Sequence, residues 1–391
     1  MTPPPAPTMA ARSNAVHGGR RQHVLLFPLP YQGHINPMFR LAGLLHAHGF
    51  AITVFHTQFN APDPARHPDY RFVPVPDGSP VPVAIEDVVA QILELGVACE
   101  AAFRDRLASV LDEYSRDAVA YLVADTHLLP IFEVAARLSV PTLALRTGSA
   151  ACCACLLAYP MLFEKGYLPV QGMQSQRDMP VTELPPYRVR IGEDDGGLRL
   201  RRELEGLRRG LAVPVFDIGP LHKLSPAVDS SLLLPDRSCL EWLDAFPPES
   251  VLYVSFGSVA CMSPRDLVET AWGIAGSGVP FLWVVRPGMV HESADDHRLP
   301  EGFEAATRER GKVVAWAPQE EVLRHRAVGG FWTHCGWNLE RGRVEAAIRR
   351  LMTDETRARA GEVKKAAAEC TGEAGSSRLA FDKLITHMMS L

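Results

Sequence analysis

Short apolar runs alternate with amphipathic stretches along most of the chain. The runs His23 to Pro28, Ala51 to His56 and Val119 to Asp125 are almost continuously apolar, which is typical of parallel strands buried on both faces. The stretch between the first two runs has apolar residues at helical spacing, and we expect Asn36 to cap this helix with Pro37 at its first position. Strand, helix and strand then form a right-handed βαβ unit.

The second half of the chain repeats this alternation. Val251 to Phe256, Lys312 to Ala317 and Val328 to Thr333 are short β-favouring runs. Pro318 ends the second of them, so that Gln319 can open a helix with acidic residues in its first turn. The pattern predicts an α/β protein with a parallel sheet in each half, joined by a loop that contains Pro and Ser.

The expected organisation has five parts. They are a disordered tail (1–22), an N-terminal Rossmann-like domain (23–221), a linker (222–236), a C-terminal Rossmann-like domain (237–376) and a terminal helix returning toward the N-terminal domain (377–391).

Two polar residues follow strands of the first predicted sheet. His34 lies in the loop after the first strand, and Asp125 ends another strand. Since parallel strands share one carboxyl edge, the two side chains should lie together, at the edge where open α/β sheets bind ligands. A carboxylate accepting the imidazole Nδ1–H would leave Nε2 free to take a proton, which makes a general-base dyad. A structural or merely exposed His34, and an Asp125 that caps the following helix, are the alternatives.

A turn, His334-Cys335-Gly336, follows the run that ends at Thr333. In a parallel α/β unit such a turn leads into a helix N-terminus, whose free N–H groups favour a phosphate. The strand end at Trp316 to Gln319 should lie at the same edge, so we expect an anion or nucleotide site there.

Composition argues against nucleic-acid binding, a membrane span and a zinc site. The chain has 391 residues, of which 47% are hydrophobic, and a net charge of −5, which gives no electrostatic reason to expect nucleic acid. Runs of the roughly 18–20 apolar residues needed to span a membrane do not occur. The cluster Cys152-Cys153-Ala154-Cys155 lacks a nearby His or second cysteine pair; we therefore expect buried thiols rather than zinc. Unpaired thiols suit a reducing cytoplasm.

Two motifs carry a family resemblance. Pro30 to Pro37 (PYQGHINP), together with Trp316 to Asn338 (WAPQEEVLRHRAVGGFWTHCGWN), resembles the plant family-1 glycosyltransferases, which use UDP-sugars and have the two-Rossmann GT-B fold. The N-terminal half looks most like the benzoxazinoid glucosyltransferases of grasses. A nucleotide-cofactor oxidoreductase on paired Rossmann domains is disfavoured, because only one glycine follows the first strand where the GxGxxG motif needs three.

The resemblance implies an inverting UDP-glucose-dependent O-glucosyltransferase that needs no metal or cofactor, acts on a small hydroxylated acceptor such as a hydroxamic acid or flavonoid-like phenol, and is a monomer. His34 would be the base and Asp125 its partner. A further set of residues would hold the UDP-sugar: Thr147, Gly257, Ser258, Trp316, Ala317, Gln319, His334, Gly336, Trp337 and Asn338.

The chain departs from the family after Asn338. The Glu for the ribose hydroxyls and the acid-Gln pair for the sugar are absent, and Glu340 stands two positions too early, so it should point away from the ribose. A helix carrying Val344, Ile348 and Leu351 on one face should follow directly. The stretch between Tyr187 and Leu211 is also shortened. A splice form and a gene-model artefact both fit these gaps. We expect impaired turnover, the alternative being a non-catalytic relative that retains partial UDP binding.

Overall fold

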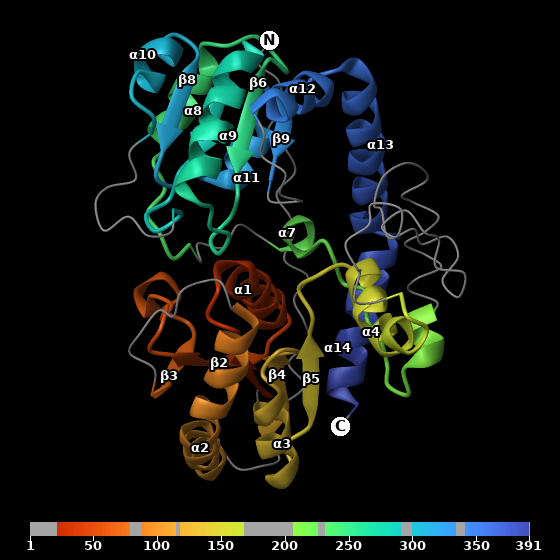
Figure 1. The fold of residues 1–391 in the computed structure, drawn as a ribbon. Coiled ribbons are helices and arrows are strands. Elements are labelled where there is room, and N and C mark those ends of the chain that lie inside the picture. Colours follow the sequence, from red (N-terminus) through yellow and green to blue (C-terminus); the bar gives the residue numbers. More distant parts are fainter. Residues whose placement is uncertain are drawn as a thin grey trace, which may run out of the picture.

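The computed structural model describes residues 22–78, 88–114, 118–167, 206–225, 231–290, 299–333 and 341–390. The predicted tail lies outside these ranges except for Gln22. Two α/β lobes stand one above the other, and a pair of helices from the end of the chain runs along one side of both (Figure 1). Each lobe has its own parallel sheet, as the alternating pattern predicts.

The N-terminal lobe contains a five-stranded parallel sheet in the order β3-β2-β1-β4-β5. Its strands are β1 (His23–Phe27), β2 (Ala51–Thr57), β3 (Arg71–Val75), β4 (Val119–Asp125) and β5 (Thr142–Leu145). The central strands β1 and β4 pair with one another, which brings the carboxyl ends at Phe27 and Ala124 side by side. The loops that follow both strands therefore meet at one point of the sheet edge.

Helices cover both faces of this sheet. They are α1 (Gln32–Ala47) on one face and α2 (Val88–Tyr114) and α3 (Leu129–Arg137) on the other. The 3-10 turn η1 (Pro64–Arg66) follows β2, and the helix α4 (Ala150–Glu164) follows β5. One apolar core packs α1 against the sheet. A second core lies on the opposite face, where Phe103 of α2 stacks on Phe27 with ring centroids 5.2 Å apart.

The start of α1 differs from the sequence-based prediction. The helix begins at Gln32 rather than after Asn36, so Pro37 lies inside it and Asn36 is not its cap. Pro37 cannot donate to the carbonyl group of Gly33, four residues before it, while Gln32 Nε2 donates to Asn36 Oδ1 at 2.5 Å across the first turn. As a result, His34 lies in the first turn of a helix and not in a free loop.

The C-terminal lobe contains a four-stranded parallel sheet in the order β8-β7-β6-β9. Its strands are β6 (Val251–Ser255), β7 (Phe281–Val284), β8 (Gly311–Val314) and β9 (Val328–Trp332). The helices around it are α8 (Ser238–Asp244), α9 (Pro264–Ser277), α10 (Phe303–Thr307), α11 (Gln319–Arg324) and α12 (Arg341–Leu351). The strand β8 ends earlier than predicted, and this leaves Trp316 in the turn that leads to α11.

The helix α12 packs directly on α9. Val344 and Ile348 are buried there, on the face that the sequence predicts, and Leu351 packs against the same core. The approach is close, because a Cβ built on Gly273 of α9 would lie 2.5 Å from Val344 Cγ1. The chain after the shortened motif thus still completes an apolar core of the C-terminal lobe.

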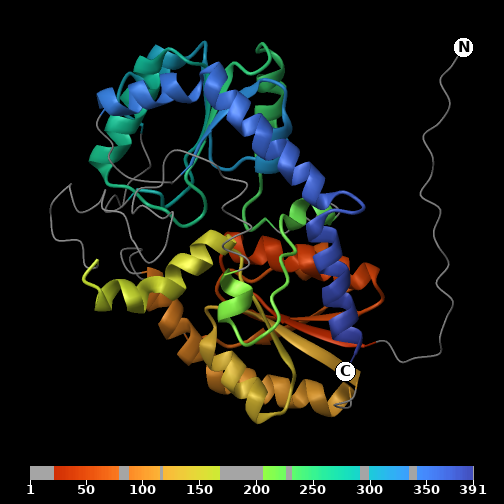
Figure 2. The same ribbon diagram turned by 90° about the vertical axis from the view of Figure 1, so that its right-hand side faces the viewer.

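The end of the chain returns to the N-terminal lobe. The helix α13 (Asp354–Thr371) leads from the upper lobe to α14 (Ser376–Met389), which lies beside the lower one (Figures 1 and 2). Phe381 and Met388 of α14 join the core that also contains α1. The short helix α7 (Leu221–Leu224) lies where we expect the start of the linker.

The cysteine cluster in α4 differs from the expectation of buried thiols. Cys152 is exposed, Cys153 and Cys155 are half-buried, and none of the three forms a disulfide. α4 is apolar around its whole circumference, but the lobe does not cover all of it. The side chains of Leu157 and Phe163 are more than half exposed to solvent. Among the described residues, no helix has the length and apolar character to cross a membrane.

Candidate active site

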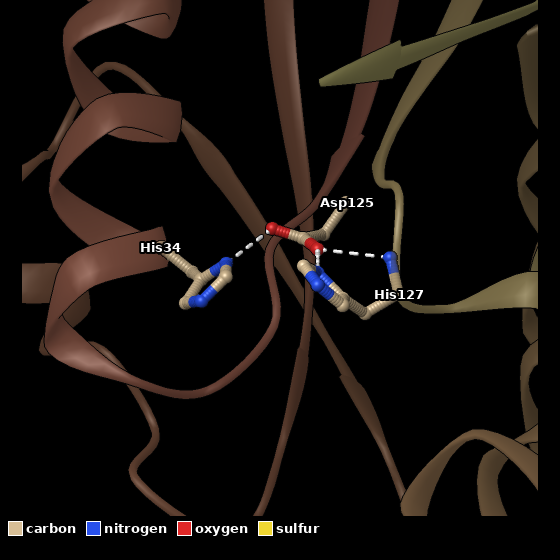
Figure 3. A group of neighbouring side chains, drawn as sticks. All are labelled: His34, Asp125 and His127. Atoms are coloured by element: carbon tan, nitrogen blue, oxygen red, sulfur yellow. Dashed lines mark hydrogen bonds and ion pairs between the residues drawn. The ribbon is translucent and has the colours of Figure 1, made fainter. Parts of the chain in front are cut away.

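His34 and Asp125 meet at the carboxyl edge of the first sheet. The imidazole Nδ1 of His34 lies 2.7 Å from Asp125 Oδ2 (Figure 3). Asp125 is the last residue of β4 and its side chain is 0% exposed, whereas that of His34 is 21% exposed. The geometric expectation from the sequence is therefore met. Asp125 does not cap α3, because the N-cap position is Leu128 and no side chain caps that helix.

A second histidine, which the sequence analysis missed, bonds to the same carboxylate. His127 Nδ1 lies 2.7 Å from Asp125 Oδ1, and the backbone N–H of His127 donates to that oxygen at 3.0 Å. The two imidazole rings are nearly perpendicular, with centroids 5.3 Å apart (Figure 3). The signal in the sequence was the spacing Asp-x-His after a buried strand, which is typical of a turn in which the Asp side chain bonds the backbone two residues on.

The charge of Asp125 follows from these contacts. Burial by itself raises the pKa of this carboxyl group, but the hydrogen bonds from His34 and His127 outweigh burial and hold the pKa below its ordinary value. The carboxylate is therefore ionised near neutral pH. An ionised, inaccessible Asp125 that accepts from Nδ1–H keeps both neutral imidazoles in the tautomer whose Nε2 is a free acceptor.

The same three side chains place metal-ligand atoms within 4.8 Å of one another, the one such group found among the described residues. Each Nδ1 atom, however, stands at hydrogen-bond distance from its own carboxylate oxygen. Metal ligands would surround a common point instead. We interpret the group as a hydrogen-bonded triad.

Thr147 lies beside this triad. Its Oγ1 stands 3.3 Å from His34 Nδ1, in the segment that follows β5. The resemblance suggests a contact of Thr147 with donor sugar or phosphate; the structure brings the hydroxyl to His34.

The turn after β6 contains Gly257 and Ser258. Gly257 has a φ of 79°, which a glycine adopts without strain. Arg286, after β7, is 6% exposed and donates through Nε to Gly257 O at 3.2 Å and through Nη2 to Ala260 O at 2.7 Å. This buried guanidinium, which the sequence analysis did not single out, holds the turn in place.

The remaining described donor-site candidates lie at the end of β8. Trp316 is half-buried, and its indole Nε1–H donates to Ser231 Oγ at 3.0 Å. Ala317 is buried, and Gln319 is the exposed first residue of α11. His334, Gly336, Trp337 and Asn338, like Glu340, lie outside the described residues.

Polar contacts join the two lobes next to these side chains. Arg40 of α1 donates from Nη2 to Glu320 Oε1 of α11 at 2.5 Å. Gln32 Oε1 accepts the backbone N–H of Leu232 at 2.6 Å. The helix that carries His34 is thus tied directly to the helix that begins with Gln319, and Figure 1 shows α1 on the side of its lobe that faces the other.

Comparisons with known proteins agree on one family. Residues 237–346 match the model for UDP-glucoronosyl and UDP-glucosyl transferases. The chain is 45% identical over 362 residues to DIMBOA UDP-glucosyltransferase BX8 of Zea mays, covering 82% of this chain and 78% of that protein. It is 34% identical to UDP-glycosyltransferase 76B1 of Arabidopsis thaliana, covering 94% of this chain and 98% of the relative. That alignment runs over 441 positions, more than the 391 residues present here, so parts of the relative have no counterpart in this chain.

Solved structures share the fold. Medicago truncatula UGT71G1, complexed with UDP-glucose, has a TM-score of 0.72 at 21% identity, with 94% of this chain and 98% of that one covered. Os79 of O. sativa, in complex with UDP, has a TM-score of 0.68 at 25% identity, covering 93% and 100% of the two chains. This chain and both solved structures thus share the arrangement of two α/β lobes with parallel sheets.

Proposed function

The chain belongs to the plant family-1 UDP-glycosyltransferases and has their GT-B fold, and on that premise we propose that it is an inverting UDP-glucose-dependent O-glucosyltransferase for a small hydroxylated metabolite. The observation that carries the proposal is the bond between His34 Nδ1 and the buried Asp125. Such a pair leaves Nε2 available as a base.

In the proposed reaction His34 Nε2 takes the proton of the acceptor hydroxyl. The oxygen attacks the anomeric carbon of glucose from the face opposite UDP, the bond between that carbon and the diphosphate oxygen breaks, and UDP leaves with the bonding pair. Asp125 stabilises the imidazolium that forms. General-base assistance of this kind contributes about 10²–10⁴-fold to the rate.

On the donor side, we assign the uracil ring to Trp316 and the diphosphate to the turn at Gly257 and Ser258. Backbone N–H groups of a tight turn favour an anion, and Arg286 fixes the shape of this turn through its carbonyls. Ala317 would read the base edge through its backbone, and Gln319 would reach the ribose. His334 and Asn338, with Gly336 and Trp337, complete the proposed phosphate and sugar contacts.

The acceptor class rests on likeness. BX8 and BX9 of Zea mays are named as DIMBOA UDP-glucosyltransferases, and each is 45% identical to this chain. We therefore propose a benzoxazinoid hydroxamic acid first and a flavonoid-like phenol second. The described cysteines form no disulfide, which suits a reducing cytoplasm, where we propose that the monomer acts.

We further propose that turnover by this chain is impaired. Parts of the Arabidopsis relative have no counterpart in this chain, and the residues that would grip ribose and glucose are absent after Asn338. A chain that binds UDP without turning over the sugar is the alternative, since Trp316 and the Gly257 turn are retained.

The test measures UDP binding by calorimetry and glucoside formation by chromatography on the purified chain, with UDP-glucose and a hydroxamic acid or flavonol. We expect micromolar to millimolar UDP binding and slow glucoside formation, which His34→Ala lowers about 10²–10⁴-fold. Turnover that is unchanged in a folded His34→Ala protein would refute the base. A rate equal to that of a full-length relative would refute the impairment, and UDP binding with no product at all would favour the non-catalytic alternative.

A further inference from the structure

We propose that His127 is a positioning residue for the base: it holds the Asp125 carboxylate with one oxygen directed at His34, and it shares the charge of that carboxylate. The inference rests on the proposed function, because it concerns the group that accepts the acceptor's proton.

The two carboxylate oxygens of Asp125 have different partners. Oδ1 accepts two bonds, from the backbone N–H of His127 at 3.0 Å and from its Nδ1 at 2.7 Å, whereas Oδ2 faces His34 Nδ1 at 2.7 Å. Rotation of the carboxylate would break both bonds to His127 at once. Oδ2 is therefore kept on the line to His34 by groups on the opposite side of the carboxylate.

The turn after β4 makes this arrangement possible. The backbone N–H of Leu128 donates to Asp125 O at 3.0 Å, which closes a tight turn with His127 at its centre. The His127 side chain folds back onto the Asp125 side chain, and it remains 37% exposed. His127 belongs to neither apolar core of this lobe, so its replacement removes no core packing.

Charge sharing follows from the same contacts. Among the described residues, the groups found to act on the charge of Asp125 are His34 and His127, and the hydroxyl of Thr147 beside them is neutral. The single negative charge of Asp125 thus interacts with two imidazole rings. A donor on Oδ1 withdraws part of that charge from Oδ2, and a protonated His127 would withdraw more. His127 should therefore oppose protonation of His34 and extend the pH range in which the base is free.

The experiment uses the intact chain with His127→Ala and His127→Asn. The Asn amide nitrogen stands where the imidazole Nδ1 stands along the side chain, so this variant keeps a donor for Asp125 but cannot take a proton. Histidine labelled with ¹⁵N reports tautomer and titration of His34 by two-bond ¹H–¹⁵N spectra, with His34→Gln identifying the signal. This readout does not require turnover.

We expect neutral His34 to carry its proton on Nδ1 in the wild type, and its titration midpoint to move up by about half a pH unit in His127→Ala. His127→Asn should recover most of that difference. Where turnover is measurable, the acid limb of kcat/KM should move to higher pH in the same order. A midpoint in His127→Ala that equals the wild type, or lies below it, would overturn the inference. If His34→Ala keeps full activity, the proposed base fails, whereas a change confined to the His127 variants concerns the inference alone.

Discussion

Arg40 Nη2 lies 2.5 Å from Glu320 Oε1, and this ion pair joins the helix that carries His34 to the helix that opens with Gln319. The Arg40 side chain is 9% exposed and that of Glu320 is 40% exposed. The pair therefore links the proposed acceptor side of the site directly to the proposed donor side.

We expect Arg40→Met to lower kcat/KM by about 5–10-fold, because loss of the pair loosens the lobes against each other. Glu320→Gln should have a smaller effect, since its side chain is more exposed. The double variant should be no worse than Arg40→Met, which makes a double-mutant cycle the measurement. Strictly additive effects would mean that the two side chains act independently.

Trp316 gives a second prediction. Trp316→Ala should weaken UDP binding by about 10–100-fold, because stacking on a base contributes about 1–3 kcal/mol. Trp316→Phe keeps a ring face but cannot donate to Ser231, so it should lose about 2–10-fold.

Ser231→Ala serves as the matched control for that bond. It should reproduce the Trp316→Phe loss in the wild type and add nothing in the Trp316→Phe background. Calorimetry with UDP measures the wild type and the four variants. An unchanged affinity in Trp316→Ala would remove this residue from the uracil site.

The packing of α12 gives a third prediction. Gly273→Ala should destabilise the protein by about 1–3 kcal/mol, because the new Cβ would stand 2.5 Å from Val344 Cγ1 and 3.1 Å from the backbone oxygen of Arg341. Gly361→Ala, in α13, meets nothing within 4 Å and should stabilise by up to about 1 kcal/mol. Urea unfolding followed by fluorescence gives both values. If Gly273→Ala were as stable as the wild type, α12 would not pack on α9 in solution.

The cysteines give a fourth prediction. Burial raises the pKa of the Cys99 thiol to about 12 and also raises the pKa of the Cys239 thiol. Roughly one Cys99 thiol in ten thousand is then ionised at pH 8. A thiol reagent should modify exposed Cys152 within minutes and leave Cys99 and Cys239 untouched until urea unfolds the chain, as read by mass spectrometry of peptides. Cys152→Ser is the control. Early labelling of Cys99 would contradict the core described for α2.

Much of the fold is predictable from the pattern of apolar residues. The bounds of β4 coincide with the predicted run Val119 to Asp125, because a strand buried on both faces leaves an uninterrupted apolar signal. The predicted start of α1 was wrong. Pro37 has the properties of a first helical residue, but the helix begins at Gln32, where a side-chain bond between Gln32 and Asn36 spans the first turn.

The site is predictable only in part. His34 and Asp125 could be paired because parallel strands share one edge, but His127 was missed, because the spacing Asp-x-His is also typical of an ordinary turn. Arg286 was missed because its partners are carbonyl oxygens of another loop, a contact that leaves no pattern in the sequence. The exposure of Cys152 depends on which side of an all-apolar α4 is covered, and tertiary packing decides that.

The return of α14 has a consequence for biosynthesis. Phe381, Leu384 and Met388 fill the same core as Val24 of the first strand and Tyr121 of β4. Domains generally begin to fold from the N-terminus during synthesis, but here the first sheet lacks part of one apolar layer until α14 has left the ribosome. The lobe that is translated first is therefore completed only after the other lobe has been synthesised, and its uncovered apolar face should be accessible to chaperones during that time.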